Sequence, residues 1–312
     1  MNLIRILSLE GLPCISLNCL LFLLIFPTAF AQTNPTPPAP SPDDRYVLGP
    51  MSQPQTGVPQ GTITEFTLRD SKIYPGYSHK WWLYVPAQYD GKRPIALMVF
   101  QDGGGFVGRD GSWRVPVVLD NQIASKELPV MAAVFVDPGE ATENRELGSV
   151  ERSFEYDTLS SQYASFLIRE ILPLVAKQVR VSSDPDARGI AGASSGGICA
   201  FTAAWNHPDQ FRKVFSAYGS FVNIRGGGAY PDLIRQSAKK PLRIFLQDGV
   251  HDELGGPYAG LNWPEGNRAM AAALGSRNYD YQLVMGVGTH SSNHAASIFP
   301  DAMRWLWRDY PR

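Results

Sequence analysis

The pattern of apolar and polar residues changes character near residue 95. Residues 62–68 and 80–85 are rich in Thr, Ile and aromatic side chains, which predicts two strands that suit antiparallel pairing. Beyond them, short and nearly continuous apolar runs predict strands that are buried on both faces. These runs are residues 95–100, 130–136, 189–193, 214–218, 243–246 and 281–285.

Helical patterns follow or separate these runs, at residues 159–179, 196–206, 265–274 and 294–308. Strand followed by helix, repeated along a chain, predicts an α/β fold with a mostly parallel central sheet and helices on both faces. We expect a single catalytic domain over residues 61–312. Ligands of such sheets bind in the loops that leave the carboxyl ends of the strands, so candidate chemistry is sought there.

The N-terminal part of the chain predicts export. Arg5, an apolar run at residues 19–26 and a small-residue pattern that ends at Ala31 indicate a signal peptide over residues 1–31. The apolar run is shorter than the roughly 20 residues that span a bilayer, so we expect no stable membrane insertion after cleavage. The proline-rich residues 32–60 predict an extended linker. The expected location is secreted or periplasmic.

Composition narrows the choice of partner. The formal net charge is -1 and no run of Lys or Arg is present, so nucleic acid is not an expected partner. Cys14 and Cys19 fall in the expected signal peptide, which leaves Cys199 without a cysteine to pair with. A small or neutral molecule is therefore the expected ligand, and the fold must be stabilised by its core.

One strand-turn-helix carries a nucleophile motif. The predicted strand at residues 188–191 runs into Gly192-Ala193-Ser194-Ser195-Gly196, a G-x-S-x-G sequence, and a helical pattern follows. Glycine at the two flanking positions lets the backbone pack closely around a strained turn that exposes the serine hydroxyl. The pattern predicts Ser194 as a nucleophile, with the positive end of the next helix aimed at the site.

A serine hydroxyl needs a base, and the chain contains 5 histidines. His290 lies in the loop after the last predicted strand, where this fold carries its base, and His294 is the main alternative. A zinc site formed by His290 and His294 is a further reading, but no third ligand is evident and the H-E-x-x-H glutamate is missing. We therefore expect no metal and no other cofactor.

The base needs a carboxylate, and three follow the strand at residues 243–246: Asp248, Asp252 and Glu253. Asp248 directly adjoins the strand and suits an Asp-Gly turn. Asp252 lies further into the loop, within reach of a histidine from the end of the next strand. This spacing favours Asp252 and leaves Asp248 as the alternative.

The tetrahedral intermediate of acyl transfer needs backbone N–H donors. Ser195, which follows the nucleophile, is expected to supply one. The other is expected from the loop at residues 100–106, where three consecutive glycines allow an N–H to face a substrate without a side chain in the way.

Three segments together resemble the esterase family of α/β-hydrolases, which includes enterochelin esterase, esterase D, feruloyl and acetylxylan esterases and the mycolyltransferases. Residues 192–197 are similar to its G-x-S-x-G-G elbow, residues 288–291 to its G-x-H-S loop, and residues 249–252 to the segment that bears its acid. The resemblance runs from about residue 62 to the end. It implies the α/β-hydrolase fold and Asp252 as the acid, and the Asp-Gly-Gly sequence at 102–104 implies Gly104 as the second oxyanion donor.

Substrate contacts are also expected. The segment that contains Arg152 and Tyr156 resembles a family segment beside the active site, which makes both candidates for substrate binding. Trp263 lies in a loop on the expected catalytic side, where an indole can stack on a sugar or phenolic ring.

These expectations describe a secreted serine carboxylic-ester hydrolase that acts through an acyl-enzyme. Export and the resemblance favour carbohydrate-linked acyl or feruloyl esters, or siderophore lactones, as substrates. An acyltransferase that uses the same acyl-enzyme is one alternative. A non-catalytic protein that binds a carbohydrate or a siderophore is the other, because one fold can host many functions.

Overall fold

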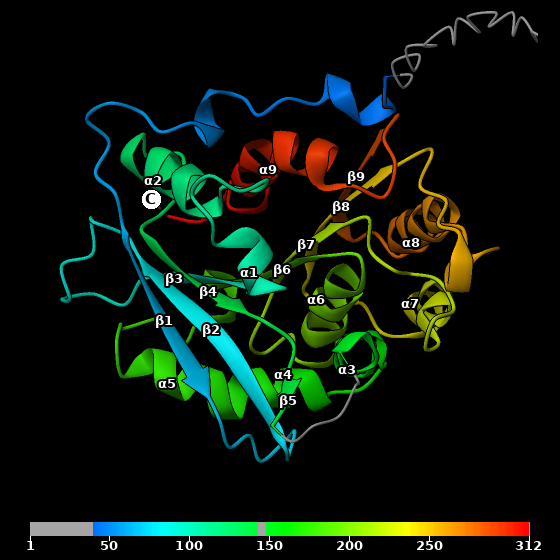
Figure 1. The fold of residues 1–312 in the computed structure, drawn as a ribbon, viewed down its shortest axis with the longest axis horizontal. Coiled ribbons are helices and arrows are strands. Elements are labelled where there is room, and N and C mark those ends of the chain that lie inside the picture. Colours follow the sequence, from blue (N-terminus) through cyan, green and yellow to red (C-terminus); the bar gives the residue numbers. More distant parts are fainter. Residues whose placement is uncertain (1–39, 143–147, 312) are drawn as a thin grey trace, which may run out of the picture. The chain divides into compact units, whose positions relative to one another are not determined.

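The computed structural model describes residues 40–142 and 148–311. The expected signal peptide and the first part of the expected linker, residues 32–39, lie outside this range. Within it, one 9-stranded sheet has the order β1-β2-β4-β3-β6-β7-β8-β9, with β5 paired to β2 (Figure 1). The strands are β1 (Thr62–Leu68), β2 (Tyr77–Val85), β3 (Ala96–Gln101), β4 (Met131–Val136), β5 (Glu140–Ala141), β6 (Arg188–Ala193), β7 (Lys213–Ala217), β8 (Arg243–Gly249) and β9 (Asp280–Gly286).

The pairing follows the predicted change of pattern. Strand β2 pairs antiparallel with both β1 and β4, whereas the neighbours from β4 through β9 are all parallel. Strands β3, β4 and β7 are buried along their whole length, and β1 is not. The predicted mostly parallel α/β-hydrolase sheet is confirmed.

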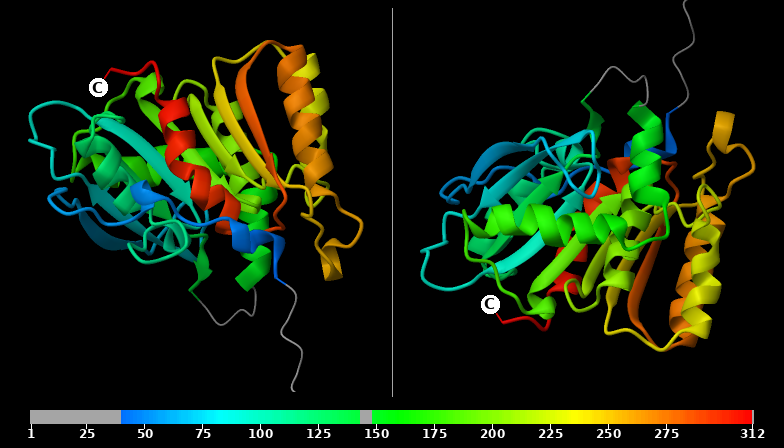
Figure 2. Two further views of the ribbon diagram at one scale, coloured as in Figure 1. Left: turned by 90° about the horizontal axis from the view of Figure 1, so that it is seen from above. Right: turned by 90° about the horizontal axis from the view of Figure 1, so that it is seen from below.

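Helices cover both faces of the sheet (Figures 1 and 2). Alternate residues of β3 enter two different hydrophobic clusters: Leu97 and Val99 one, Met98 and Phe100 the other. The first cluster includes residues of α4, α6, α7 and α8, and the second includes residues of α1, α2 and α9. The bounds are α1 (Gly103–Phe106), α2 (Val115–Ala124), α3 (Gly148–Asp157), α4 (Gln162–Phe166), α5 (Leu172–Ala176), α6 (Ser195–Asn206), α7 (Tyr230–Gln236), α8 (Trp263–Ser276) and α9 (Ser292–Leu306).

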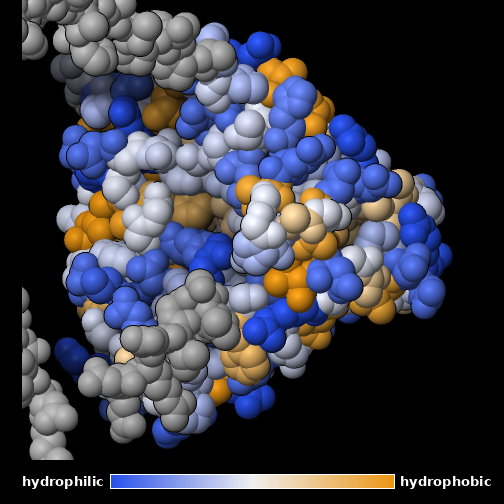
Figure 3. Space-filling model, turned by 45° about the vertical axis from the view of Figure 1, so that its right-hand side comes forward, coloured by the Kyte–Doolittle hydropathy of each residue, from blue (hydrophilic) through white to orange (hydrophobic). Residues whose placement is uncertain are grey.

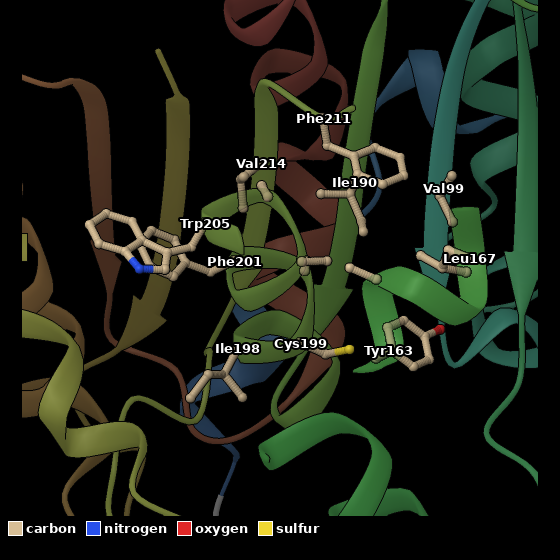
Figure 4. Packing of buried hydrophobic residues seen from close by; sticks show 14 of the residues in the cluster. Val99, Tyr163, Leu167, Ile190, Ile198, Cys199, Phe201, Trp205, Phe211 and Val214 are labelled. Carbon is tan, nitrogen blue, oxygen red and sulfur yellow. The ribbon is translucent and has the colours of Figure 1, made fainter. Parts of the chain in front are cut away.

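Helix α6, which follows the nucleophile motif, lies in the interior. Figure 4 shows Phe201 of α6 in the same layer of side chains as Ile190 of β6 and Val214 of β7. Because α6 is apolar on nearly all sides, it is fixed by packing between the sheet and α3, α4 and α7. This rigidity holds the start of α6, and with it Ser194, in a constant position relative to the strand ends.

The helix predicted over residues 159–179 is interrupted. Between α4 and α5 the chain forms a π-helical turn at Leu167–Ile171. Pro173 lies just beyond it and has no N–H to donate to Arg169 four residues earlier, so the regular ladder cannot continue. Helices α1, α2, α3 and α7 were not predicted.

The N-terminal segment, residues 40–60, corrects the expected domain boundary. The chain from Pro40 onward groups with the rest of the domain. The Asn121 side-chain amide donates to the carbonyls of Met51 and Gln53, 2.9 Å away in both cases. Residues 40–60 are therefore not a free linker: they include two short 3-10 helices, Pro42–Arg45 and Pro50–Ser52, and some of their polar atoms bind partners in the domain.

The surface of the described residues is mixed in character. On the face drawn in Figure 3, apolar groups are interleaved with polar ones. In the part of the chain that the structure covers, no helix has the length and apolarity that a bilayer crossing requires.

Candidate active site

Ser194 lies on a strained turn between β6 and α6. Its backbone has φ 57° and ψ -124°, a region that non-glycine residues rarely occupy. A Cβ added to Gly192 would lie 2.2 Å from the carbonyl oxygen of Gly196, so only glycine fits there. The turn is tied to the end of β7, because Ser194 N–H donates to Ala217 O at 2.9 Å and Ser220 N–H donates to Ser194 O at 3.1 Å.

The structure brings Ser194, His290 and Asp252 together. His290 Nε2 lies 2.8 Å from Ser194 Oγ, and His290 Nδ1 lies 2.7 and 2.9 Å from the two oxygens of Asp252. His290 is in the loop between β9 and α9, and Asp252 follows β8. All three residues therefore extend from the carboxyl ends of parallel strands, where ligands bind in this class of sheet.

The contacts of His290 define its tautomer. An ionised carboxylate only accepts hydrogen bonds, so the Asp252 contact assigns the proton to His290 Nδ1 and leaves Nε2 free to accept from Ser194. The Asp252 carboxylate is fully buried, so water does not compete for this contact. The rings of Tyr218 and Trp263 lie edge-on to the imidazole, with centroids 4.8 and 5.3 Å away. In this arrangement His290 Nε2 can accept the hydroxyl proton of Ser194.

Asp248, the alternative acid, has other partners. Its carboxylate accepts from Gly249 N–H at 2.7 Å and from the Asn267 side-chain amide at 2.8 Å. Burial, followed by the neighbouring Asp252 carboxylate, raises the pKa of Asp248 above its ordinary value of 3.8. Asp248 is therefore suited to a neutral, structural role behind Asp252.

His294, the alternative base, also faces away from Ser194. Gln247 Nε2 donates to His294 Nδ1 at 2.9 Å, and the ring of Tyr46 stacks on His294 with centroids 4.2 Å apart. Burial lowers the pKa of His294, which favours the neutral form of the ring. Since both ring nitrogens of His290 are engaged with Ser194 and Asp252, the two histidines do not converge as a zinc pair. Among the described residues, no group of three or more His, Cys, Asp or Glu could hold a metal ion.

The two expected oxyanion donors are placed differently. Ser195 begins α6 directly after Ser194. Gly104 does not face the site: its N–H donates to Asp137 Oδ1 at 2.8 Å. The physical reason is the local conformation, since Asp102 adopts a left-handed φ of 56° and starts the one-turn helix α1, which turns Gly104 toward β4 and the Asp137 that follows it. The structure thus contradicts the assignment of Gly104.

A cavity of about 340 Å³ opens over Ser194. Its wall includes both polar and aromatic groups: Asp102, Gly105, Phe106, Ser112, Trp113, Arg152, Ala193, Ser194, Tyr218, His290, Ser291 and Ser292. A larger cavity of about 480 Å³ is lined by charged residues, among them Lys213 and Arg243. Lys213 and Arg243 are the first residues of β7 and β8. That cavity therefore lies at the amino ends of the parallel strands, whereas Ser194 lies at their carboxyl ends.

Of the three expected substrate contacts, only Arg152 lines the cavity. Its guanidinium donates to both oxygens of Asp102, at 2.6 and 2.7 Å, so its charge is already paired. Tyr156 is fully buried: it accepts from Asp102 N–H at 3.2 Å and donates to Val136 O at 3.3 Å. Tyr156 therefore supports the cavity wall from behind and is not available to a substrate, which corrects the expectation.

Trp263 also differs from the expectation. Its side chain is 1% exposed, and its indole N–H donates to Ser220 Oγ at 3.1 Å. Sequence reasoning expected Trp263 to stack on a substrate and did not identify Ser220. Ser220 could have been found from its position, because it is the first serine after the carboxyl end of β7.

The comparisons with known proteins agree with this geometry. The family described as "Putative esterase" matches residues 74–305. YbbA of Bacillus subtilis is 22% identical over 246 residues, which are 74% of this chain and 93% of that protein. The iron(III) enterobactin esterase of Escherichia coli is 24% identical over 184 residues, which are 57% of this chain and 42% of that protein.

Solved structures show the same fold. The enterobactin esterase of Shigella flexneri matches with a TM-score of 0.66 and 22% identity, over 82% of this chain and 62% of that one. The ferulic acid esterase of Anaeromyces mucronatus matches with a TM-score of 0.64 and 14% identity, over 83% and 97%. This chain thus spans less than two thirds of the enterobactin esterases it matches. Since the family match covers most of the chain and includes the nucleophile elbow and the histidine loop, the protein belongs to the esterase family.

Proposed function

We propose that this protein is a serine carboxylic-ester hydrolase, with Ser194 as nucleophile, His290 as general base and Asp252 as the group that orients His290. The observation that carries the proposal is the continuous set of hydrogen bonds from Ser194 Oγ to His290 Nε2 at 2.8 Å and from His290 Nδ1 to Asp252 at 2.7 Å. Both distances are within the range of well-formed hydrogen bonds.

The chemistry follows from these contacts. His290 takes the Ser194 proton while Oγ attacks the ester carbonyl, and the resulting oxyanion lies near the N–H of Ser195 at the start of α6. His290 then gives its proton to the departing alcohol, which leaves an acyl-enzyme. Water attacks the acyl-enzyme with His290 again as base, and the carboxylic acid is released.

Ser194→Ala tests the assignment of the nucleophile. We expect kcat for p-nitrophenyl acetate to fall by at least about 10⁴-fold with the fold intact, because the acyl-enzyme cannot form. Ser125→Ala, which removes an exposed hydroxyl at the end of α2, is the matched control and should keep the wild-type rate. A folded Ser194→Ala protein with a near-normal rate would refute the proposal.

We also propose the substrate class: carbohydrate-linked acyl or feruloyl esters, or siderophore lactones. The cavity of about 340 Å³ and its aromatic wall of Phe106 and Trp113 support this class, and similar folds occur in proteins titled ferulic acid esterase and enterobactin esterase. A panel of acetyl, feruloyl, glucuronoyl and trilactone esters, assayed on wild type and Ser194→Ala, tests it. Product analysis with an added sugar acceptor separates hydrolysis from acyl transfer.

Export, to the periplasm or the medium, is part of the same proposal. It is supported by the signal-peptide pattern at residues 1–31. Recovery of the protein in a periplasmic or medium fraction, with an N-terminus near Gln32, is the expected result. A cytoplasmic protein that keeps residues 1–31 would contradict it.

A further inference from the structure

A second hydroxyl adjoins the proposed nucleophile. Ser220 is 1% exposed and lies in the loop after β7. Its Oγ is 3.4 Å from Ser194 Oγ and 3.1 Å from the indole nitrogen of Trp263. The backbone fixes this approach, because Ser220 N–H donates to Ser194 O at 3.1 Å. Ser220 therefore stands between Trp263 and Ser194.

The donors in this group determine the direction of each hydrogen bond. An indole N–H can only donate, so Ser220 Oγ must accept from Trp263. The single proton of Ser220 is then free to point at Ser194 Oγ. Ser194 in turn directs its own proton to His290 Nε2, which lies 2.8 Å away. The donors thus run in one direction, from Trp263 through Ser220 and Ser194 to His290.

We propose that Ser220 is a further catalytic residue, which donates a hydrogen bond to Ser194 Oγ during attack, and that Trp263 is a positioning residue that sets the direction of that bond. This inference rests on the proposed esterase function. As His290 removes the Ser194 proton, Oγ gains negative charge, and a bond to a charged acceptor is stronger than one to a neutral hydroxyl. The Ser220 proton stays on Ser220 throughout.

The same bond acts in the second half of the reaction. When water attacks the acyl-enzyme, the bond between the acyl carbon and Ser194 Oγ breaks, and Oγ again carries negative charge until His290 returns the proton. Ser220 faces the same atom in both steps. Its contribution is therefore to the barriers and not to substrate binding, which predicts a change in kcat with little change in KM.

Ser220→Ala is the direct test. We expect kcat for p-nitrophenyl acetate to fall about 10- to 100-fold, as for the loss of a hydrogen bond to a charged group, with KM within about threefold of wild type. The matched control is Ser216→Ala in β7, the strand that precedes Ser220: Ser216 is fully buried, and its Oγ has no hydrogen-bond partner within the described residues. Ser216→Ala should keep the wild-type kcat.

A double-mutant cycle with Trp263→Phe tests the positioning role. We expect Trp263→Phe to lower kcat about 3- to 10-fold on its own and to have no further effect in the Ser220→Ala background, because phenylalanine keeps an aromatic ring beside His290 and the lost indole N–H acts only through Ser220. Trp81→Phe controls for the loss of an indole as such. The buried indole N–H of Trp81, unlike that of Trp263, has no hydrogen-bond partner among the described residues. Independent, multiplicative effects of the two substitutions would show that Trp263 does not act through Ser220 and overturn that role.

The failure of this inference can be told apart from the failure of the proposed function. A fluorophosphonate probe labels Ser194 if it is an activated nucleophile. Slower labelling of Ser220→Ala than of wild type supports the inference. Equal labelling rates and equal kcat overturn it while leaving the esterase proposal intact, whereas wild-type protein that is not labelled at all overturns both.

Discussion

The backbone of Ser194 concentrates strain at one residue. Its φ of 57° and ψ of -124° carry a conformational cost on the order of 1–3 kcal/mol. Two hydrogen bonds, from Ser194 N–H to Ala217 O and from Ser220 N–H to Ser194 O, offset that cost. The strain exposes the hydroxyl, and the bonds that offset it also bring Ser220 to Ser194 Oγ.

Gly192→Ala tests this account at a single residue. The new Cβ would lie 2.2 Å from Gly196 O, a backbone atom that cannot rotate away. We expect the free energy of unfolding to fall by at least about 2 kcal/mol and esterase activity to be lost. The control is Gly255→Ala, where the Cβ meets nothing within 4 Å at a φ of -89°; it should match wild type in urea unfolding and in rate. A Gly192→Ala protein of wild-type stability would contradict the steric argument.

Among the elements, the N-terminal segment has a direct link to the histidine loop. Asp43 accepts from Thr289 N–H at 3.1 Å and from the Thr289 hydroxyl. The Tyr46 hydroxyl accepts from Val287 N–H at 2.7 Å. Both contacts restrain the loop that presents His290 to Ser194. Residues whose composition resembles a linker thus help to position His290.

We therefore expect Asp43→Ala combined with Tyr46→Phe to lower kcat about tenfold, because the imidazole samples more orientations when its loop is released. Hydrogen exchange at the amides of Val287 and Thr289 should rise in the same protein. Arg45→Ala, an exposed substitution in the same turn, is the control and should change neither quantity. Faster exchange without a change in kcat would show that the contacts serve stability alone.

The sequence predicts an element well when the element's own residues show the pattern of burial, and poorly when the structure depends on contacts with distant residues. The strands of the parallel sheet were predicted to within a few residues, because runs of apolar residues report burial on two faces directly. Helix α2 was missed because it is buried almost all round and shows little helical periodicity. The segment at residues 40–60 was misjudged because proline content predicts extension but not the tertiary partners of an extended chain.

The same distinction applies to the site. Ser194, His290 and Asp252 lie in loops whose position follows from strand order, so their convergence was predictable. The direction of the Gly104 N–H was not, because it depends on Asp137, which follows a different strand. Nor could the sequence reveal that the Trp263 indole turns inward to Ser220.

At the scale of the whole molecule, the catalytic side of the sheet gathers buried carboxyl groups. Burial is the largest cause of a raised pKa for Asp137, Asp157 and Asp248. Asp137 and Asp248 follow or end strands of the sheet, and Asp157 ends α3 close to Ser195. A carboxyl whose pKa is higher in the folded than in the unfolded state takes up protons on folding. Its stabilising effect is complete below the unfolded pKa and is lost as pH rises through the folded pKa.

Asp248→Asn isolates one such group, since the amide keeps the shape of the side chain but does not titrate. As pH rises from about 5 to 9, we expect wild type to lose stability relative to Asp248→Asn, by at most about 1.4 kcal/mol for each pH unit. Groups that do not contact Asp248 are common to both proteins, so their effects cancel in the difference, and what remains belongs to Asp248 and its neighbour Asp252. Urea unfolding across this pH range gives that difference directly, with exposed Asp232→Asn as the control that should run parallel to wild type. If the free energies of unfolding of wild type and Asp248→Asn instead change in parallel with pH, Asp248 is ionised in the folded protein. That result would contradict the neutral role assigned to Asp248.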